Sequence, residues 1–290
     1  MSTTIEELRP RAFAIAYRML GRVSDAEDIV QEALLRVHRA MESGEPIRSP
    51  QAFTTTVVTR LALDELKSAR VQREEYVGEW IPEPLLTTGD DDPAAHAEMA
   101  DSLSVAFLVL LESLSPAQRA AMLLHDVFDY PYPEVARILG KTEAACRQLV
   151  LRARRQVREG RPRFDVDRQD AERLADLFFA AVRGGDLEAL ESALAGDVSL
   201  HGDGGGKVPA LARPVAGRDR VARVLLSWGQ AAAKRGLTIR QTLINGQPGA
   251  LTLDREGRVF SVLMLDIGAD GIRTIRGVVN PDKLAHLRAV

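Results

Sequence analysis

Residues 115–158, SPAQRAAMLLHDVFDYPYPEVARILGKTEAACRQLVLRARRQVR, decide the fold of the middle of the chain. The stretch opens with a capping box, in which Ser115 accepts from the third helical residue and Gln118 reaches back to the cap. Pro116 suits the first helical position, so a helix is expected to begin there. Pro131 ends that helix, because proline lacks an N–H donor and restricts the residue before it.

Two further helices are predicted after this break. Pro133 begins a short second helix, and Gly140 ends it as a residue in the left-handed conformation. Thr142 caps a third helix, and Glu143 lies well against the positive end of that helix. Three helices joined by short turns, the last of them basic, indicate a DNA-binding helix-turn-helix.

The third helix separates an apolar stripe from a basic face when it is plotted at 100° per residue. The stripe contains Cys146, Leu149, Val150, Ala153 and Val157, and the other side carries Arg147, Gln148, Arg152, Arg154, Arg155 and Arg158. Between Lys141 and Arg163 there are eight basic residues and two acidic ones, whereas an ordinary surface helix mixes both signs. Arginine grips phosphate or guanine and glutamine can read adenine, so DNA binding is favoured over a merely solvated face.

The composition limits the class of protein. A length of 290 residues predicts two or three domains, and 46% apolar residues are enough for proper cores. The net charge of −3 argues against a protein that coats nucleic acid indiscriminately. Cys146 is the only cysteine and the five histidines are scattered, so no disulfide, metal site or cofactor is expected. The lack of an apolar signal core or a membrane-length apolar run predicts a cytosolic protein.

The first forty residues predict two amphipathic helices. The first spans residues 3–20, and Pro10 is expected to separate or kink its first turn. Ser24 and Glu27 form a capping box for the second helix, which runs to about residue 41. The outer face of the second helix carries Asp25, Asp28, Gln31 and Glu32 near its start. Acids in a first turn also simply stabilise the helix dipole, and this explains Asp25 better than Glu32.

A third helix is predicted from Ser49 and Pro50 to about residue 73. Its expected core is Phe53, Val57, Val58, Leu61, Ala62 and Leu66. The second half of this helix presents a polar and mostly basic surface, formed by Arg60, Asp64, Lys67, Ser68, Arg70 and Arg73.

Residues 74–101 form an acidic segment with nine carboxylates and no lysine or arginine. Such a segment is typical of a flexible, self-repelling tether. However, residues 80–86 read WIPEPLL, and a tryptophan among prolines and leucines prefers an extended conformation that presents an apolar anchor. Docking onto another domain is therefore favoured over simple tethering. A helix is expected from about residue 93 to residue 114.

The remainder of the chain, after a boundary near residues 161–163, predicts an α+β domain. Two helices, at 171–182 and 186–194, come first. Period-2 segments follow at residues 198–201, 237–243, 249–253, 259–267 and 272–279, with one helix inserted at 218–234. Helices followed by a curved antiparallel sheet fit a half-cone of the NTF2/SnoaL type.

Catalysis by this last domain is considered and not expected. The polar candidates are His201, Asp203, Asp254, Asp266 and Arg276, and a histidine with a carboxylate could do acid–base chemistry if both faced a cavity. His201 and Asp203 stand among glycines, which favours a tight loop. The glycine-rich loop also lacks the strand-to-helix context of a nucleotide site.

Two segments carry a resemblance to a known family. Residues 24–32, SDAEDIVQE, and 49–53, SPQAF, resemble region 2 of a group IV (extracytoplasmic-function type) sigma factor. Residues 143–149, EAACRQL, with the arginines of 152–155, resemble region 4.2 of the same family. The linker motif at residues 80–85, DGGGK at 203–207 and NPDKL at 280–284 are similar to motifs of sigma factors that carry a SnoaL-like C-terminal extension.

The resemblance implies roles for individual residues. Those matching the surface that docks on the clamp helices of the largest subunit of core RNA polymerase are Asp25, Asp28, Gln31 and Glu32. Those matching the element that opens and reads the −10 region of promoter DNA are Arg60, Asp64, Lys67, Ser68 and Arg70, while Ala62 replaces a DNA-contacting residue of many relatives. Those matching the −35 reader are Lys141, Thr142, Glu143, Arg147, Gln148, Arg152, Arg154 and Arg155. Those matching interdomain and regulatory motifs are Trp80, Pro82, Glu83, Pro84, Asp203, Gly204, Gly205, Gly206, Lys207, Asn280, Pro281, Asp282 and Lys283.

The expected organisation is multidomain. It comprises an all-α region 2 bundle at 1–75, an acidic linker at 76–102, a region 4 helix-turn-helix at 103–163 and a SnoaL-like regulatory domain at 168–290. We expect a sigma factor that is not an enzyme, with intramolecular contacts from the last domain to the linker and the sigma domains. Two alternatives stay open: a regulator in which a small ligand in the cone controls the helix-turn-helix, and a SnoaL-type enzyme with a DNA anchor.

Overall fold

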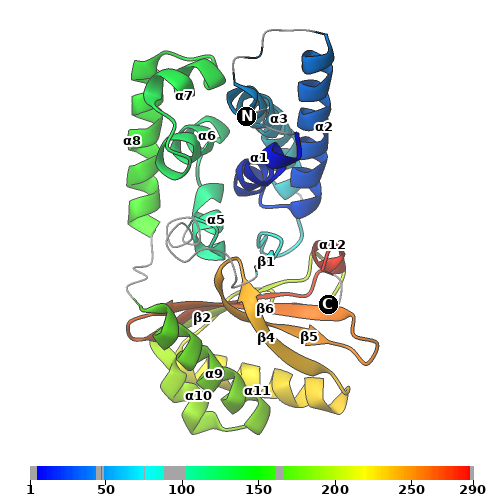
Figure 1. Ribbon diagram of the computed structural model, residues 1–290. Helices are drawn as coiled ribbons and strands as arrows, with labels where there is room; N and C mark the ends of the chain where they lie inside the picture. The colour runs from blue at the N-terminus through cyan, green and yellow to red at the C-terminus, as the bar shows by residue number, and fades with distance from the viewer. Residues whose placement is uncertain are drawn as a thin grey trace. The chain divides into compact units, whose positions relative to one another are not determined.

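The computed structural model describes residues 5–43, 47, 49–74, 76–87, 102–160 and 166–287, and it describes no side chains at 69–74 and 159–160. The chain divides into two compact units (Figure 1). The first contains Met1–Glu75 and Phe107–Arg161, and the second contains Tyr76–Ala106 and Pro162–Val290. No helix within the described ranges is long and apolar enough to cross a membrane.

The first unit is helical throughout its described part. Its elements are α1 (Ile5–Leu20), α2 (Val23–Glu42), α3 (Pro50–Glu74), α5 (Val105–Glu112), α6 (Pro116–Met122), the π-helical turn η1 (Leu123–Val127), α7 (Tyr132–Leu139) and α8 (Glu143–Gly160). The first three pack against one another around a core that includes Ile15, Leu20, Val30 and Val58. The helix predicted at 93–114 is described only from residue 102 onward, where α5 forms its second half.

Two expectations for the first helices need correction. Pro10 does not separate the first turn, since it lies inside an α1 that is continuous from Ile5 to Leu20. Ser24 does not cap α2, which begins at Val23 with Arg22 as an N-cap that makes no side-chain capping bond. The helix thus begins two residues earlier than the Ser24 cap predicts, and its first residue, Val23, is buried. The start of α3 is as predicted, since the Ser49 hydroxyl accepts from the Ala52 amide at 3.2 Å.

The sequence signals of the helix-turn-helix are confirmed in detail. Ser115 Oγ accepts from the Gln118 amide at 3.3 Å, and Gln118 Oε1 accepts from the Ser115 amide at 3.0 Å. Gly140 ends α7 with φ 62°, and Thr142 Oγ1 accepts from the Ala145 amide at 3.2 Å. These caps fix where α6, α7 and α8 begin and end.

The end of the first of these helices was not predicted in full. Beyond Met122 the helix widens to a π-helical turn, in which the Phe128 amide donates to the Leu123 carbonyl at 3.0 Å. Asp129 then adopts φ 57°, the left-handed region that asparagine and aspartate tolerate best after glycine. This reversal directs Tyr130 back into the core, where it is buried.

The two helical parts of the first unit pack directly on each other. Thr55 of α3 and Tyr130 share a buried hydrogen bond of 2.8 Å between their hydroxyl oxygens. Arg119 of α6, only 3% exposed, donates through Nη1 to the Met19 carbonyl of α1 and through Nε to the Leu111 carbonyl. Burial lowers the pKa of Arg119 to about 10.

The second unit consists of helices and one seven-stranded sheet. Its elements are β1 (Leu86–Thr87), α9 (Arg168–Gly184), α10 (Leu187–Ala193), β2 (Leu194–Asp203), β3 (Val215–Ala216), α11 (Arg218–Lys234), β4 (Thr238–Ile244), β5 (Gln247–Leu253), β6 (Val259–Gly268), β7 (Gly271–Val278) and α12 (Pro281–Leu284). The strand order is β1-β4-β5-β6-β7-β2-β3. The inserted helix has the predicted bounds, and the architecture is the expected NTF2/SnoaL-like one.

The sheet differs from the prediction in three ways. It is mixed, because β2 pairs with β7 in parallel while the other pairs are antiparallel. His201 and Asp203 belong to β2, so the tight loop begins only at Gly204. Finally, β1 comes from the linker and joins the edge of the sheet beside β4.

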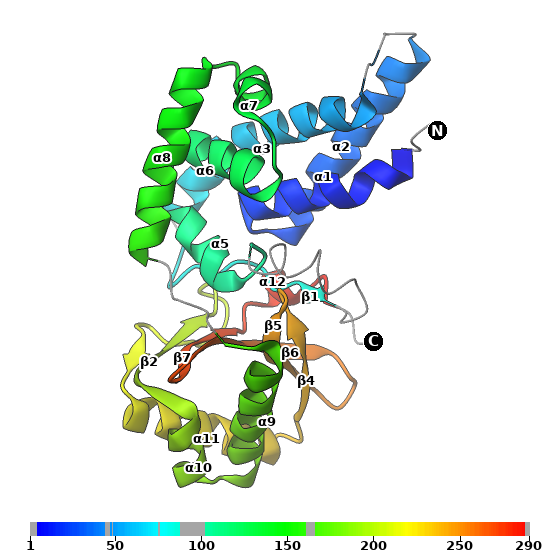
Figure 2. The same ribbon diagram turned by 60° about the vertical axis from the view of Figure 1, so that its left-hand side comes forward.

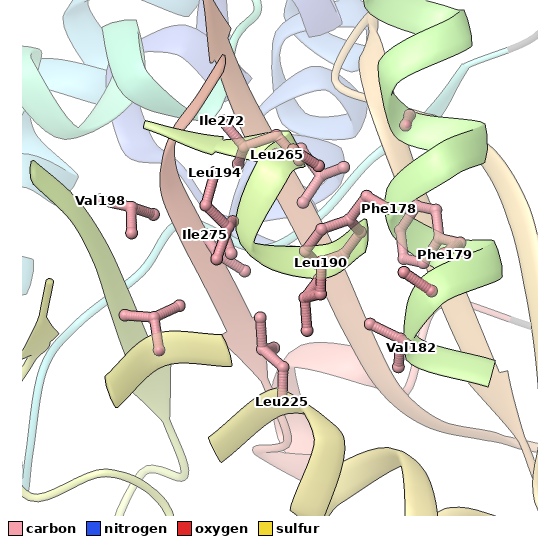
Figure 3. Close-up of a cluster of buried hydrophobic side chains, with 14 of the residues drawn as sticks. Phe178, Phe179, Val182, Leu190, Leu194, Val198, Leu225, Leu265, Ile272 and Ile275 are labelled. Carbon is pink, nitrogen blue, oxygen red and sulfur yellow. The ribbon is translucent and has the colours of Figure 1, made fainter. Parts of the chain in front are cut away.

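One face of the sheet is covered by helices α9, α10 and α11 (Figures 1 and 2). The main core of the unit lies between these helices and the sheet. There Phe178, Phe179 and Leu190 of the helices meet Leu265 and Ile275 of the sheet (Figure 3). The remaining members drawn and labelled there are Val182, Leu194, Val198, Leu225 and Ile272. The interior of this cone is therefore filled by apolar side chains.

Candidate functional surfaces

The predicted division of α8 into two faces is borne out by burial. Cys146, Val150, Ala153 and Val157 are buried, and burial raises the pKa of the Cys146 thiol. The exposed residues of the opposite side are Lys141, Thr142, Arg147, Gln148, Arg152, Arg154, Arg155 and Arg158, and Glu143 is half-buried. Leu151 is also 62% exposed, an apolar residue that the pattern did not single out.

Two arginines of this face already have partners within the fold. The Arg147 guanidinium pairs with Glu143 at 3.1 Å and lies 4.9 Å from the centroid of the Tyr132 ring. Arg154 forms a bidentate pair with Asp126, with N···O distances of 2.9 and 2.7 Å, and this pairing raises the pKa of Arg154. The bidentate pair thus holds the Arg154 guanidinium in a fixed direction.

The polar surface of α3 is exposed at Arg60, Asp64, Lys67 and Ser68. Asp64 and Lys67 pair with each other at 2.7 Å. Arg60 Nε donates to the Ile138 carbonyl of α7 at 3.3 Å. The side chain of Arg70 lies outside the described residues.

Ala62 is fully buried in the helical core, as the predicted core of α3 has it. The residues around it on α3 meet the helix-turn-helix. Arg60, Asp64 and Lys67 line one pocket together with Ser115 and Lys141. The side chains predicted to read two separate promoter elements therefore lie around a common hollow in this unit.

The acidic surface of α2 is only partly free. Asp28 and Gln31 are exposed, whereas Asp25 pairs with Arg22 at 3.2 Å and Glu32 with Arg36 at 2.7 Å. Leu35 is 42% exposed and follows Gln31 and Glu32 at helical spacing, so it shares their face. Polar residues beside one exposed leucine form a surface suited to another protein. Sequence reasoning did not single out Leu35, because it considered only polar residues for this surface.

A buried carboxylate joins the linker to the C-terminal domain. Asp203 is fully buried and accepts four hydrogen bonds. Its Oδ1 accepts from the Tyr76 hydroxyl at 2.5 Å and from the Gly205 amide at 3.1 Å. Its Oδ2 accepts from the Ile81 amide at 2.9 Å and from Lys283 Nζ at 2.6 Å.

Lys283 completes this cluster from the other side. Its ammonium group donates also to the Ile81 carbonyl, and it lies 4.3 Å from the centroid of the Trp80 ring and 4.8 Å from that of Tyr76. Only 4% of Lys283 is exposed, so its charge is compensated by Asp203 and by the two aromatic faces. Burial and the neighbouring Asp203 carboxylate raise the pKa of Tyr76.

The two other motifs of the C-terminal domain shape this cluster. Asn280 caps α12 by accepting from the Asp282 amide at 3.1 Å, and its Nδ2 donates to the Tyr76 hydroxyl at 2.9 Å. Gly205 has φ 57°, and a Cβ there would lie 2.1 Å from Asn280 Nδ2. A Cβ on Gly204 would lie 2.2 Å from the Val208 carbonyl oxygen. Gly206 also has a positive φ, and Lys207 pairs with Asp282 at the surface.

The rest of the linker segment is held along its length. Pro82, Glu83 and Pro84 are buried. The Leu85 amide donates to Asn245 Oδ1 at 2.9 Å, and the Asn245 amide donates back to the Leu85 carbonyl at 2.7 Å.

Two histidines of the C-terminal domain hold linker residues as well. His201 Nδ1 lies 2.7 Å from the Glu79 carboxylate, and His286 Nε2 lies 2.8 Å from the Pro84 carbonyl oxygen. Sequence reasoning missed the partner residues Tyr76, Glu79, Ile81, Asn245 and His286. For two of these residues, Tyr76 and Glu79, the only available signal was their position next to the tryptophan motif in the sequence.

The candidate catalytic residues do not face the interior of the cone. Strand register pairs His201 with Arg276, while the neighbouring pair Leu200 and Ile275 belongs to the core beneath the helices. Because side chains alternate along a strand, His201 and Arg276 lie on the opposite face of the sheet. Arg276 forms a buried ion pair with Asp266, and burial raises the pKa of Asp266 more than this arginine lowers it.

The other candidates have structural partners too. Asp254 holds the turn before β6 through bonds from the Glu256 and Arg258 amides. Desolvation opposes the ionised form of Asp254, but these bonds and the Arg258 side chain outweigh it and lower the pKa of this carboxyl. Among the residues that the structure describes, no group of three His, Cys, Asp or Glu side chains is arranged to hold a metal ion.

Comparison with known proteins gives matches along most of the chain. A family model described as Sigma-70 region 2 matches residues 4–71, and one described as Sigma-70, region 4 matches residues 104–157. The ECF RNA polymerase sigma factor SigJ of Mycobacterium tuberculosis is 40% identical over 96% of this chain and 91% of its own length.

Two further matches extend over nearly the same length. The probable ECF RNA polymerase sigma factor SigI of Mycobacterium tuberculosis is 33% identical over 95% of this chain and 91% of its own. The crystal structure of Mycobacterium tuberculosis SigJ has a TM-score of 0.78 and 37% identity, with 98% of each chain covered. The similarity thus includes both helical parts and the C-terminal domain.

Proposed function

The chain belongs to the extracytoplasmic-function (ECF) sigma factors of RNA polymerase, and on this premise we propose how its surfaces divide the work of promoter recognition and of its control. A sigma factor binds core RNA polymerase and directs the start of transcription at promoters. The regulation described below, by the fused C-terminal domain, belongs to the proposal.

The exposed face of α8 reads the −35 element in the major groove. Support comes from its exposed Arg152 and Arg155 and from the directed guanidiniums of Arg147 and Arg154. A helix presenting arginine and glutamine opposite a packed stripe has the chemistry of direct readout. Lys141 and Thr142, at the start of the helix, contact the backbone there.

The polar surface of α3 contacts the −10 region. Arg60 and Lys67 supply positive charge for the phosphates, and Asp64 orients Lys67 through their ion pair. Ser68 and Arg70 continue this surface toward the end of the helix.

The surface of α2 binds the clamp helices of the largest polymerase subunit. The exposed Asp28 and Gln31, with Asp25 and Glu32 at the rim, give it a negative and hydrogen-bonding character. Leu35 adds an apolar anchor beside Gln31 and Glu32, at the end of this surface.

Promoter binding requires the first unit to open. Promoter elements centred about 25 base pairs apart lie about 85 Å apart along straight duplex at 3.4 Å per base pair. Arg60 of the −10 surface, however, contacts the carbonyl of Ile138, two residues before Gly140 at the end of α7. The packed arrangement is thus a resting state, and core polymerase shifts the population toward an open one by offering contacts to both halves.

The docked linker favours the resting state. Residues 76–87 belong to the segment that connects the two helical halves of the first unit, and they are fixed on the C-terminal domain through Asp203, Lys283 and Asn280. Those residues are no longer available as free tether while they are docked. Undocking lengthens the tether and lowers the cost of separating the two DNA-contacting halves.

The observation that carries this proposal is the buried Asp203, which binds two linker residues and the ammonium of Lys283. Run-off transcription with core polymerase on a genomic promoter library tests it, with the full-length chain and its Asp203→Asn variant side by side. The variant is expected to give more transcript from the same promoters. Equal transcript at every promoter would contradict control by the linker, and no transcript from either protein would contradict the assignment of the surfaces.

A further inference from the structure

Charge is unevenly distributed within the C-terminal domain. Residues 207–240 contain eight basic side chains and a single acidic one, Asp219. The preceding residues 166–206 contain three basic and nine acidic side chains. A surface designed only for solubility interleaves both signs, so this separation needs another explanation.

The basic side chains gather around helix α11. We define the α11 basic surface as Arg213, Arg218, Arg220, Arg223, Lys234 and Arg235, all of which are exposed. Helix α11 packs through Val221, Ala222 and Leu225 against the core of the domain (Figure 3).

The geometry of α11 places three of these residues in one row. At 100° per residue, Arg220, Arg223 and Lys234 fall on the side of the helix opposite the packed residues, and Ser227 and Gln230 lie between them. Arg220 and Lys234 are separated by 14 residues, which corresponds to about 21 Å along the axis. Within the described part of the chain, Arg223 is the only member of the surface in an ion pair, with Asp219 at 2.6 Å.

Such a row matches the phosphate backbone of duplex DNA. Arginine and lysine provide the charge, and serine and glutamine add short hydrogen-bond donors of the kind that contact phosphate oxygens. We propose that the α11 basic surface binds the backbone of promoter DNA without sequence preference, as a third DNA contact besides those of α3 and α8. This inference rests on the proposed function, because the promoter complex brings duplex to the protein.

The acidic residues 88–101 of this same chain are the competing occupant. They carry five carboxylates and no lysine or arginine, so their charge is opposite to that of the α11 basic surface of the same molecule. A duplex is favoured because the row extends over about 21 Å of straight helix, which suits regularly spaced phosphates. The experiment below distinguishes the two occupants.

The test compares two charge-matched variants of the full-length chain in holoenzyme with core polymerase. The α11 variant is Arg220→Ala with Arg223→Ala and Lys234→Ala. The control is Arg168→Ala with Arg173→Ala and Arg183→Ala, which removes three exposed arginines from helix α9. The affinity of each holoenzyme for one promoter fragment is measured between about 50 and 200 mM salt.

The slope of log affinity against log salt is negative, and the α11 variant is expected to reduce its magnitude by about 2.7, which is about 0.9 for each of the three phosphates no longer neutralised. The control is expected to retain the slope of the natural sequence. Equal slopes for the α11 variant and the unmodified protein would overturn the inference while leaving the proposed function intact. Failure of the unmodified holoenzyme to bind the promoter would instead contradict the proposed function.

A tethered cleavage reagent identifies the occupant directly. Ser227→Cys places a reactive thiol on the exposed face of α11, and the natural Cys146 is fully buried. A reagent that generates hydroxyl radicals at this position is expected to cut the promoter fragment within one short segment, where the DNA backbone lies next to α11. Cleavage within residues 88–101, or within a polymerase subunit and not in DNA, would overturn the proposal.

Discussion

Replacing Asp203 by asparagine is the sharpest perturbation of the docked linker. The carboxylate is fully buried and accepts from Tyr76, Ile81, Lys283 and the Gly205 amide. Asparagine has nearly the same shape, so the packing is conserved. Only one of its two polar atoms can accept, however, and the negative charge opposite Lys283 is lost.

The expected cost is set by the buried ammonium. Breaking one partner of a buried ion pair costs about 3–5 kcal/mol, and the lower end applies here because one oxygen remains. Lys283 also keeps the Ile81 carbonyl and two aromatic faces as partners. A cost of about 3 kcal/mol corresponds to a docking equilibrium weakened about 100-fold, since 1.4 kcal/mol is a factor of ten.

Amide hydrogen exchange at Ile81 measures this weakening, because that amide donates to the Asp203 carboxylate. In Asp203→Asn the protection of Ile81 is expected to fall about 100-fold under conditions where exchange reports the opening equilibrium. The amide of Val262 in strand β6 serves as an internal control for the fold of the domain. Unchanged protection at Ile81 would refute the reasoning, since it would mean that the carboxylate does not hold the linker.

The double variant Asp203→Asn with Lys283→Met separates charge from packing. Methionine replaces the ammonium by an apolar group of similar length, so no buried charge is left unpaired. Protection at Ile81 is expected to recover in part relative to Asp203→Asn alone. Additive effects of the two substitutions would show that the pair is not coupled and would count against the assigned ion pair.

Three further changes test other parts of the structure. Gly205→Ala forces a Cβ to 2.1 Å from the Asn280 amide at a positive φ and is expected to release the linker, whereas Gly184→Ala meets nothing within 4 Å and is expected to be neutral or stabilising in a melting curve. Arg119→Met removes the donor to the α1 carbonyl and is expected to lower the unfolding free energy of the first unit by about 2–3 kcal/mol in denaturant titration. Burial raises the pKa of Asp266 above 3.8. Its contribution to the unfolding free energy is therefore full below pH 3.8 and is lost as the pH rises through the raised pKa. Asp266→Asn is expected to flatten that part of the pH profile of the unfolding free energy.

Local signals predicted the helix-turn-helix well because its boundaries depend on near neighbours. Ser115, Gly140 and Thr142 act on residues within about one turn, and each cap is present. Ser24 carried an equally good capping signal and does not cap, since α2 begins one residue before it, at the buried Val23. The π-helical turn after Met122 has no local signal that distinguishes it from an α-helix.

The C-terminal domain was predictable in its elements and less so in its pairing. Alternating segments located β4, β5, β6 and β7, but pairing between strands more than 70 residues apart is not encoded locally. The parallel pairing of β2 with β7 therefore escaped prediction. The same holds for β1, whose two residues are recognisable as a strand only beside Leu243 and Ile244.

The linker cluster shows which part of a site a motif can reveal. Trp80, Asp203, Asn280 and Lys283 stand in conspicuous motifs and do meet in space. Ile81 contributes its backbone amide and carbonyl, groups that nearly every residue possesses, so no sequence pattern could mark it. The sequence likewise left open whether His201 and Arg276 face the interior of the cone, because strand register alone decides that they face away from it.

The central claim is that the two DNA-contacting halves are packed together at rest and separate on the promoter. The distance between labels at exposed positions away from the proposed binding faces, Met41 of α2 and Gln156 of α8, measures this in the free protein and in the promoter-bound holoenzyme. We predict a single short distance in the free protein and an increase of several tens of ångströms on the promoter, toward the roughly 85 Å between the two elements. The same distance in both states would contradict the account.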